Sequence, residues 1–518
     1  MSSVFMGSVR LANIKVWDTG EIIDIIAQTR HSHLIGETID CTGVTVTPGL
    51  VDMHVHFFDP GNTQREDIRS GSAAASAGGF TDVAMMPDTL PAADGEPFME
   101  GQASREELIG QGFSSVLDYW QRYADSFDPN QPIDYCMVAA ATVDRQGRRV
   151  SRERMWERFL RGSDSVKRYG HPVVALSDDP RAISDRMLDR VMELAHVNDL
   201  VVMDHCENHT SGMINEGELS RRLGVPGIPD SAEIDVIRRD IESCRRTGAR
   251  LHLQHVTTAG GFDLIREAKQ EGLPVTCETA PHYFALTDKD VERYGAYAKV
   301  NPPLRSAADR LATLEAIADG TVDAIATDHT PLTLADRQVH ALSALDGISG
   351  LETSYALAHT LLVTTGVIGD RRLVELMSLG PAQILGLNRN RISMMLTEDP
   401  ALAAQESLKA LATRVTVNPE ASETSDFDQI AASSQSAGQK AHRVLDLTDG
   451  RHQHVRLSLV APKQKWSIDT RRFFSNGHNS PFNGWKVHGM PIATIMGSRL
   501  HDVAQHIRNK EAHGRWNI

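Results

Sequence analysis

The sequence is poor in cysteine and contains no long hydrophobic run. Its five cysteines are widely spaced and odd in number, and most lie in apolar, strand-like stretches. This pattern is typical of reduced core thiols and excludes a disulfide framework or a zinc-knuckle spacing. No run approaches the roughly 18 to 20 apolar residues of a membrane-spanning helix, and residues 1–17 lack the pattern of a signal peptide. We therefore expect a cytoplasmic protein without a membrane partner.

Basic residues are also outnumbered. The chain has 53 Lys and Arg against 68 Asp and Glu, which gives a formal net charge of -15. This balance argues against a nucleic-acid partner. A chain of 518 residues is too long for one ordinary core, but a barrel of roughly 250 to 400 residues and a smaller domain account for it.

The most informative motif is His-Val-His at the end of an apolar run. Side chains at i and i+2 of a strand share a face, so His54 and His56 are able to bind one metal ion. Taken alone, such a pair is more often two ordinary polar residues at a strand end than a metal site. Three further apolar runs, however, end at or next to His205, His255 and Asp328. Four strand ends with metal-capable side chains favour a metal site.

Between residues 43 and 329, short apolar runs alternate with longer amphipathic segments such as 185–197 and 231–246. This alternation predicts parallel strands connected by helices. The expected strands are 47–56, 80–86, 133–140, 172–177, 200–205, 250–256, 274–280 and 322–328. Eight such units predict an α/β fold, a (β/α)8 TIM-type barrel, whose reactive groups gather at the C-terminal strand ends.

The flanking segments predict the domain organisation. Residues 1–46 and 452–518 contain β-like stretches that we expect to pair into a small β domain, with the barrel at 47–390. Residues 391–451 are expected to form an irregular or partly disordered insertion, since 397–442 are rich in Ala, Ser, Gln and Glu and poor in large apolar groups.

Several segments resemble the amidohydrolase superfamily, and within it most closely the bacterial class I dihydroorotases. They are 48–61 (PGLVDMHVHFFDPG), 78–83 (GGFTDV), 177–179 (SDD), 204–207 (DHCE), 254–257 (QHVT), 280–282 (APH), 300–305 (VNPPLR), 326–329 (ATDH), 347–353 (GISGLET) and 480–484 (SPFNG). The resemblance spans roughly three quarters of the chain, and the combined motifs are specific to the superfamily.

The resemblance implies a metal centre with one or two divalent ions, expected to be Zn2+. His54, His56 and Asp328 would hold one ion, and His205 and His255 would hold or share the second. Many superfamily members bridge the ions with a carboxylated lysine on the fourth strand, but residues 172–179 contain no lysine. Class I dihydroorotases have an aspartate there. The resemblance favours Asp179 as the bridge, with Asp178 next. The alternative is that both aspartates only cap the following helix.

The implied reaction is the opening or closing of a cyclic amide. Asp328 would act as general base and then as general acid on the leaving nitrogen. Asn301 and His282 are candidates for substrate contact, although a Pro-His pair after a strand also serves simply to satisfy loop backbone.

Three positions depart from the family pattern. Where dihydroorotases hold the substrate carboxylate with an arginine, an asparagine and a histidine, this chain has Phe58, Asp88 and Leu332. Loss of the arginine alone should weaken carboxylate binding by roughly tenfold to over a hundredfold. The arginines that would be able to take over the role are Arg65, Arg69 and Arg305.

Three functions therefore remain open. The first is a dihydroorotase, which interconverts N-carbamoyl-L-aspartate and dihydroorotate in pyrimidine biosynthesis. The second is another cyclic amidohydrolase, such as a hydantoinase, dihydropyrimidinase or allantoinase, although these usually have the bridging lysine. The third is a weakly active partner subunit of aspartate transcarbamoylase. Retention of every metal ligand argues against the third, and the first ranks narrowly ahead of the second. The expected partners are a small cyclic amide and, in assembly, a second copy or aspartate transcarbamoylase.

Overall fold

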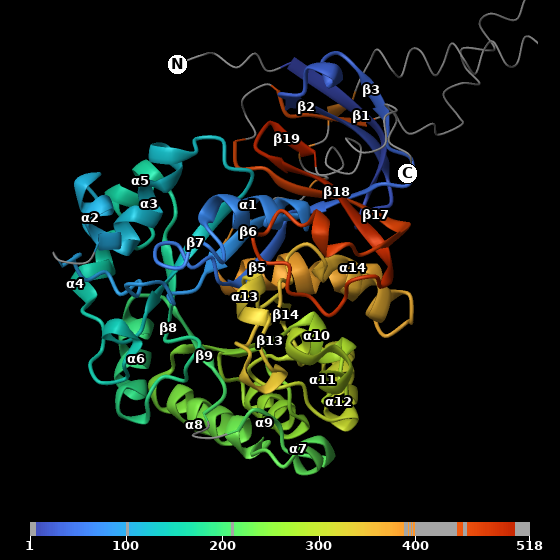
Figure 1. The fold of residues 1–518 in the computed structure, drawn as a ribbon. Coiled ribbons are helices and arrows are strands. Elements are labelled where there is room, and N and C mark those ends of the chain that lie inside the picture. Colours follow the sequence, from blue (N-terminus) through green and yellow to red (C-terminus); the bar gives the residue numbers. More distant parts are fainter. Residues whose placement is uncertain are drawn as a thin grey trace, which may run out of the picture.

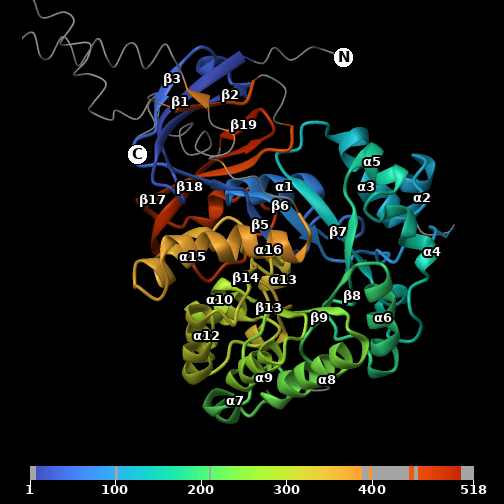
Figure 2. The ribbon, with the colours of Figure 1, turned by 180° about the vertical axis from the view of Figure 1, so that it is seen from behind.

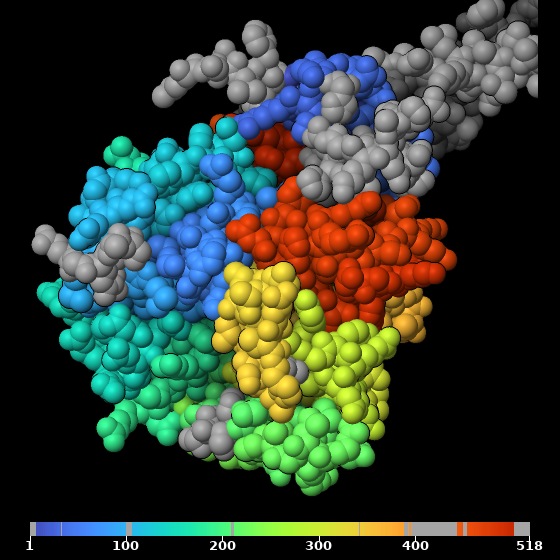
Figure 3. Space-filling view, viewed as in Figure 1, coloured from blue at the N-terminus to red at the C-terminus, as the bar shows by residue number. Residues whose placement is uncertain are grey.

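The computed structural model describes residues 7–99, 103–208, 212–387, 392, 395, 397–398, 443–448 and 453–502. A barrel with surrounding helices forms one part of the molecule, and a strand-rich part built from both ends of the chain lies beside it (Figures 1 and 2). In the space-filling view the C-terminal strands pack directly against the barrel (Figure 3). Within the described part of the chain, no helix is both long and apolar enough to cross a membrane.

The barrel contains the eight strands expected from the sequence. They are β5 (Leu50–Val55), β6 (Phe80–Met85), β7 (Asp134–Ala140), β8 (Val173–Ser177), β9 (Val201–His205), β12 (Arg250–Gln254), β13 (Val275–Thr279) and β14 (Ala324–Ile325). Every pairing is parallel, and neighbours in the sheet follow one another in sequence. A parallel bridge from Val55 to His329, with a 2.9 Å bond from His56 N to His329 O, joins the first strand to the segment just after the last. The predicted (β/α)8 fold is confirmed.

The strands form because most of their residues are apolar and both of their faces are covered. β5, β6, β8 and β9 are buried along their whole length, as expected for a parallel sheet covered on both sides. Side chains such as Met53, Val138 and Met203 fill the barrel interior, whereas Val83, Val202 and Leu253 pack with the surrounding helices.

Helices follow the barrel strands along the chain. They are α1 (Ile68–Ala77), α2 (Ala103–Gly110), α3 (Val116–Phe127), α4 (Glu153–Trp156), α5 (Asp164–Tyr169), α6 (Asp185–Val197), α7 (Glu218–Leu223), α8 (Ser231–Thr247), α9 (Ala259–Gln270), α10 (Pro281–Ala285), α11 (Asp290–Tyr294), α12 (Ala307–Asp319), α13 (Leu334–Arg337), α14 (Ser354–Ala358), α15 (Asp370–Val374) and α16 (Gly380–Ile384). α6 and α8 match the amphipathic segments seen in the sequence. A two-stranded pair, β10 (Ile214–Asn215) and β11 (Gly227–Ile228), lies between β9 and α8.

Both ends of the chain contribute to one nine-stranded sheet, as expected for the small β domain. Its strands are β1 (Gly7–Val16), β2 (Ile22–Thr29), β3 (Thr38–Asp40), β4 (Thr45–Pro48), β15 (Thr397–Glu398), β16 (Arg443–Asp446), β17 (Arg456–Ser467), β18 (Lys486–Met496) and β19 (Arg499–Asp502). β4 pairs antiparallel with β17, and β16 pairs parallel with β2. β15 and β16 fall inside the stretch 391–451, for which an irregular insertion is expected. Residues 399–442 lie outside the described residues.

The segment between β17 and β18 returns to the barrel and supports the loop after β14. Oδ1 of Asn479 accepts bonds from Leu332 N and Ser349 Oγ, both at 2.8 Å. Nδ2 of Asn479 donates to the carbonyls of Thr330 and Gly347, both at 3.0 Å. The C-terminal segment thus fixes the backbone that follows Asp328.

Candidate metal centre and active site

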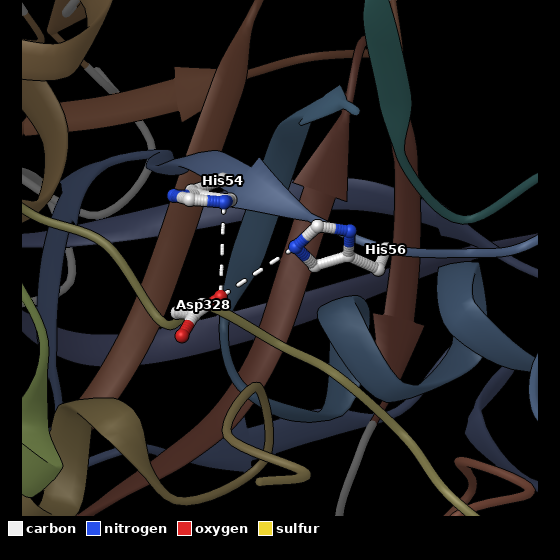
Figure 4. A group of neighbouring side chains, drawn as sticks. All are labelled: His54, His56 and Asp328. Atoms are coloured by element: carbon white, nitrogen blue, oxygen red, sulfur yellow. Dashed lines mark ion pairs between the residues drawn. The ribbon is translucent and has the colours of Figure 1, made fainter. Parts of the chain in front are cut away.

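Three of the predicted ligands meet where β5 ends and the chain leaves β14. Nε2 of His54 and Nε2 of His56 lie 3.7 and 3.5 Å from Oδ1 of Asp328. Both rings point toward this carboxylate (Figure 4). All three side chains are buried and are able to hold one metal ion together. This places them at the C-terminal end of the barrel, as the strand-end pattern predicts.

Asp179, just after β8, lies among the histidines. Its carboxylate oxygens are 3.4 Å from Nε2 of both His54 and His56, 3.5 Å from Nδ1 of His205 and 4.0 Å from Nε2 of His255. His54, Asp179 and His255 form a second group able to hold a metal ion.

The two aspartates of the pair have different surroundings. Neither oxygen of Asp179 receives a hydrogen bond from a described residue, although both are buried. Asp178 instead accepts a 2.8 Å bond from Thr142 N. A buried carboxylate without a donor among imidazoles fits a bound cation, because an unpaired buried anion is costly.

The charges of the cluster support the same interpretation. Burial opposes protonation of His54, but Asp179 and Glu278 outweigh it and raise its pKa well above the ordinary value. For Asp179, burial is outweighed by His54 and His205, and its pKa is lowered strongly. Burial, His205 and His54 lower the pKa of His255 well below its usual range. The carboxylates of the site therefore favour a nearby positive charge. The imidazoles repel one another, so that His54 and His255 do not carry a proton at the same time.

A second layer of side chains orients the histidines. Oε1 of Glu278, on β13, lies 2.7 Å from Nδ1 of His54, and Oε2 lies 3.2 Å from Nε2 of His252. Burial of Glu278 is outweighed by these two imidazoles, which lower its pKa to about 2. The sequence analysis missed Glu278 and His252. The available signal is a carboxylate within an otherwise apolar strand, Val-Thr-Cys-Glu-Thr.

Asp88 has a role that its position in the family pattern did not suggest. Its Oδ2 lies 2.9 Å from Nδ1 of His56. Burial of His56 is outweighed by Asp88 and Asp328, and its pKa rises to about 10. Asp88 lines the pocket described below, but its charge faces a predicted metal ligand.

Three non-glycine residues at the site have left-handed backbones. Phe58, His255 and Asp328 have φ values of 55°, 34° and 49°. Such conformations are costly for residues with a Cβ and concentrate at functional sites. Here they occur at or just beyond strand ends, next to the metal centre.

The metal centre opens into a pocket of about 460 Å³. The Phe58 ring centroid lies 5.8 Å from that of His56, and Leu332 is buried beside the loop after β14. Nδ2 of Asn301 lies 3.1 Å from Nε2 of His205. Phe58, Leu332 and Asn301, three of the predicted substrate-binding residues, all line the pocket.

The other two predicted substrate-binding residues, His282 and Arg305, are not among the residues that line this pocket. His282 is buried, and burial lowers its pKa to about 4, with a further contribution from His54. Arg305 is also buried, with Nη2 2.8 Å from Oε2 of Glu207 and Nε 3.1 Å from Thr257 Oγ1. Arg305 is thus committed to an internal ion pair and is not a free anchor for a substrate anion.

Comparison with known proteins agrees with this geometry. A model of the amidohydrolase family matches residues 45–391, and the chain belongs to this family. The dihydroorotase of Geobacter metallireducens is 34% identical over 492 residues, which cover 93% of this chain and 95% of the relative. The dihydroorotase of Pelotomaculum thermopropionicum is 35% identical over 468 residues, covering 90% and 88%. Among solved structures, an L-hydantoinase (dihydropyrimidinase) from Arthrobacter aurescens has a similar fold, with a TM-score of 0.64, 21% identity and 96% coverage of both chains.

Proposed function

We propose that the chain is a dihydroorotase, a metal-dependent hydrolase that interconverts dihydroorotate and N-carbamoyl-L-aspartate. The observation that carries the proposal is the position of Asp179 among four histidines. Its buried carboxylate accepts no hydrogen bond from a described residue. The similarity to dihydroorotases along nearly the whole chain supports the same substrate.

The donor set favours zinc. Imidazole and carboxylate ligands suit Zn2+ at catalytic sites that leave a position open. We propose that His54, His56 and Asp328 hold one ion and that His205 and His255 hold a second, with Asp179 between them. When bound, such ions polarise the amide carbonyl and lower the pKa of water toward neutrality.

The protein's own groups complete the reaction. Asp328 lines the pocket, and its carboxylate would accept the proton of the attacking water. The same carboxyl would then donate that proton to the ring nitrogen as the amide bond breaks. Glu278 and Asp88 hold His54 and His56 in the required ring orientation.

A second candidate is a hydrolase of neutral cyclic amides, in the manner of a hydantoinase or dihydropyrimidinase. The specific observation in its favour is the apolar wall formed by Phe58 and Leu332. A neutral ring needs no cation at these positions, whereas dihydroorotate carries a carboxylate.

Metal analysis and a substrate panel test the proposal. We expect purified protein to contain one to two zinc equivalents, and the His54→Ala/His56→Ala variant to contain substantially fewer. The matched control is His196→Ala/His340→Ala, which removes two exposed histidines and should retain the metal. In assays with dihydroorotate, hydantoin, dihydrouracil and allantoin, we expect the highest kcat/KM for dihydroorotate. Preference for dihydrouracil or hydantoin would favour the second candidate.

We further propose that the protein works in the cytoplasm, where its five buried, free cysteines stay reduced. Assembly as a homodimer, or as an active or weakly active partner of aspartate transcarbamoylase, is tested by light scattering with and without that enzyme.

A further inference from the structure

Most charges that line the pocket are already engaged. Arg65 binds Asp336 through Nε and Nη2 at 3.3 and 3.2 Å, and its guanidinium lies 5.7 Å from the centroid of the Phe58 ring. Asp346 lies 3.4 Å from Lys299. Asp88 faces His56. Arg65, Asp346 and Asp88 are therefore each paired with a group of opposite charge or an imidazole. Among the described residues, the arginine near Phe58 is therefore already paired and is not a free anchor for a substrate carboxylate.

Arg145 lines the same pocket and has a guanidinium that forms no ion pair with a described carboxylate. It follows β7, and its Nη1 donates a 2.7 Å bond to the backbone carbonyl of Asp179. Its Nε is buried without a hydrogen-bond partner among the described residues. No ion pair joins this guanidinium to a described carboxylate, and Asp178 is a carboxylate on which its charge acts. Arg145 is therefore a positive charge fixed next to the metal centre and not neutralised by an ion pair.

The backbone that presents Arg145 is strained and firmly held. Asp144 and Arg145 have φ values of 53° and 54°, two consecutive left-handed residues without glycine. Asp144 N donates to Asp94 Oδ2 at 3.0 Å, and Arg145 N donates to Thr142 O at 2.9 Å. Thr142 is in turn fixed by Asp178. Such strain persists only where the surrounding structure enforces it, and it concentrates at functional sites.

A second arginine lies at the mouth of the pocket on the same side. Arg181 follows Asp179 and Pro180, is exposed, and also lines the pocket. Like Arg145, it has no ion-pair partner within the described part of the chain. The two pocket arginines without an ion-pair partner among the described residues therefore lie on the loops after β7 and β8.

We propose that Arg145, assisted by Arg181, binds the carboxylate of the substrate. The inference rests on the proposed dihydroorotase function and deepens it, because it assigns the anion to the β7–β8 side of the metal centre. The guanidinium hydrogens of Arg145 that are not bonded to Asp179 O lie in one plane and suit a carboxylate. The bond to Asp179 O keeps this guanidinium beside the metal ligands.

The test compares Arg145→Gln with Arg148→Gln, which removes the same charge from an exposed position of the same loop. For Arg145→Gln we expect KM for dihydroorotate to rise about 10- to 100-fold, from the loss of a charge-assisted bond. The Ki of orotate, which carries the same carboxylate on a planar ring, should rise in parallel. Arg148→Gln should leave both constants unchanged. Arg145→Lys, which keeps the charge but not the planar guanidinium, should recover part of the loss.

Zinc content and thermal melting of each variant separate binding from structure. Retained zinc and melting temperature with a raised KM support the inference. A KM and Ki within twofold of the unaltered protein overturn it while leaving the dihydroorotase proposal intact. A fall in kcat and zinc content without a change in orotate affinity overturns it in favour of a structural role. Absence of dihydroorotate turnover in the unaltered protein, with turnover of a neutral ring, overturns both proposals.

Discussion

Oδ2 of Asp88 lies 2.9 Å from Nδ1 of His56, on the side of the ring away from Asp179 and Asp328. A carboxylate in this position fixes the orientation of a metal-binding imidazole and makes it a stronger ligand. This contact gives Asp88 a role in orienting His56. Its charge supports the metal centre, so its presence does not by itself repel a substrate anion.

We predict that Asp88→Asn lowers zinc affinity by about 10- to 100-fold, the usual effect of removing such a partner. Competition with a chelator of known affinity measures the change. Asp164→Asn, at an exposed helix position, serves as the control and should bind zinc like the unaltered protein. Equal affinity in both variants would show that His56 is oriented by the barrel alone.

Glu278→Gln should have a similar effect through His54. Its carboxylate bridges His54 and His252 inside the barrel, so the substitution removes the charge that holds both rings. We expect weaker zinc binding and, in addition, a lower melting temperature of the zinc-free protein, because the remaining buried network loses an ion pair. Unchanged melting with unchanged zinc affinity would contradict this assignment.

Asp328→Asn removes the proposed proton carrier while keeping the side-chain shape. We predict that kcat for dihydroorotate falls about 100- to 10,000-fold, the range typical of a lost general acid–base group. Steady-state kinetics at saturating zinc provide the measurement. A kcat within tenfold of the unaltered enzyme would assign proton transfer to a different group.

Stability should depend on pH through Glu352. Burial raises its pKa to about 8, against hydrogen bonds from the backbone N–H groups of Ser475 and Phe474, with a further contribution from Glu66. The folded state therefore binds more protons than the unfolded state between about pH 4.5 and 8, and the free energy of unfolding falls as pH rises through this window.

Glu352→Gln should flatten that slope, with a difference of roughly 1 to 4 kcal/mol between pH 5 and pH 8. Urea denaturation at the two pH values measures it. Glu193→Gln, at an exposed position of α6, is the matched control. Identical slopes in the two variants would show that Glu352 does not link stability to pH.

The barrel was predictable because its strands are continuous apolar runs that end on polar side chains. β5 and β9, for example, lie inside the expected ranges and end next to or on the expected ligands. β14 is only two residues long, whereas the expected strand spanned 322–328. The chain leaves the sheet after Ile325 and reaches a left-handed backbone at Asp328.

The composition of the pocket was not predictable to the same degree, because it depends on pairings between loops. Sequence spacing gives no sign that Asp88 faces His56 or that Arg305 is buried against Glu207. Arg145 was missed for the same reason. Its contact with Asp179 joins the loops after two different strands.

The most direct test of the central claim is kcat/KM for dihydroorotate measured as a function of zinc content. Chelator-treated protein is reconstituted with increasing zinc and assayed for ring opening, with the His54→Ala/His56→Ala variant alongside. The account predicts turnover proportional to bound zinc and no recovery in the variant. Dihydroorotate turnover that is independent of zinc, or zinc-loaded protein that opens only neutral rings, would contradict it.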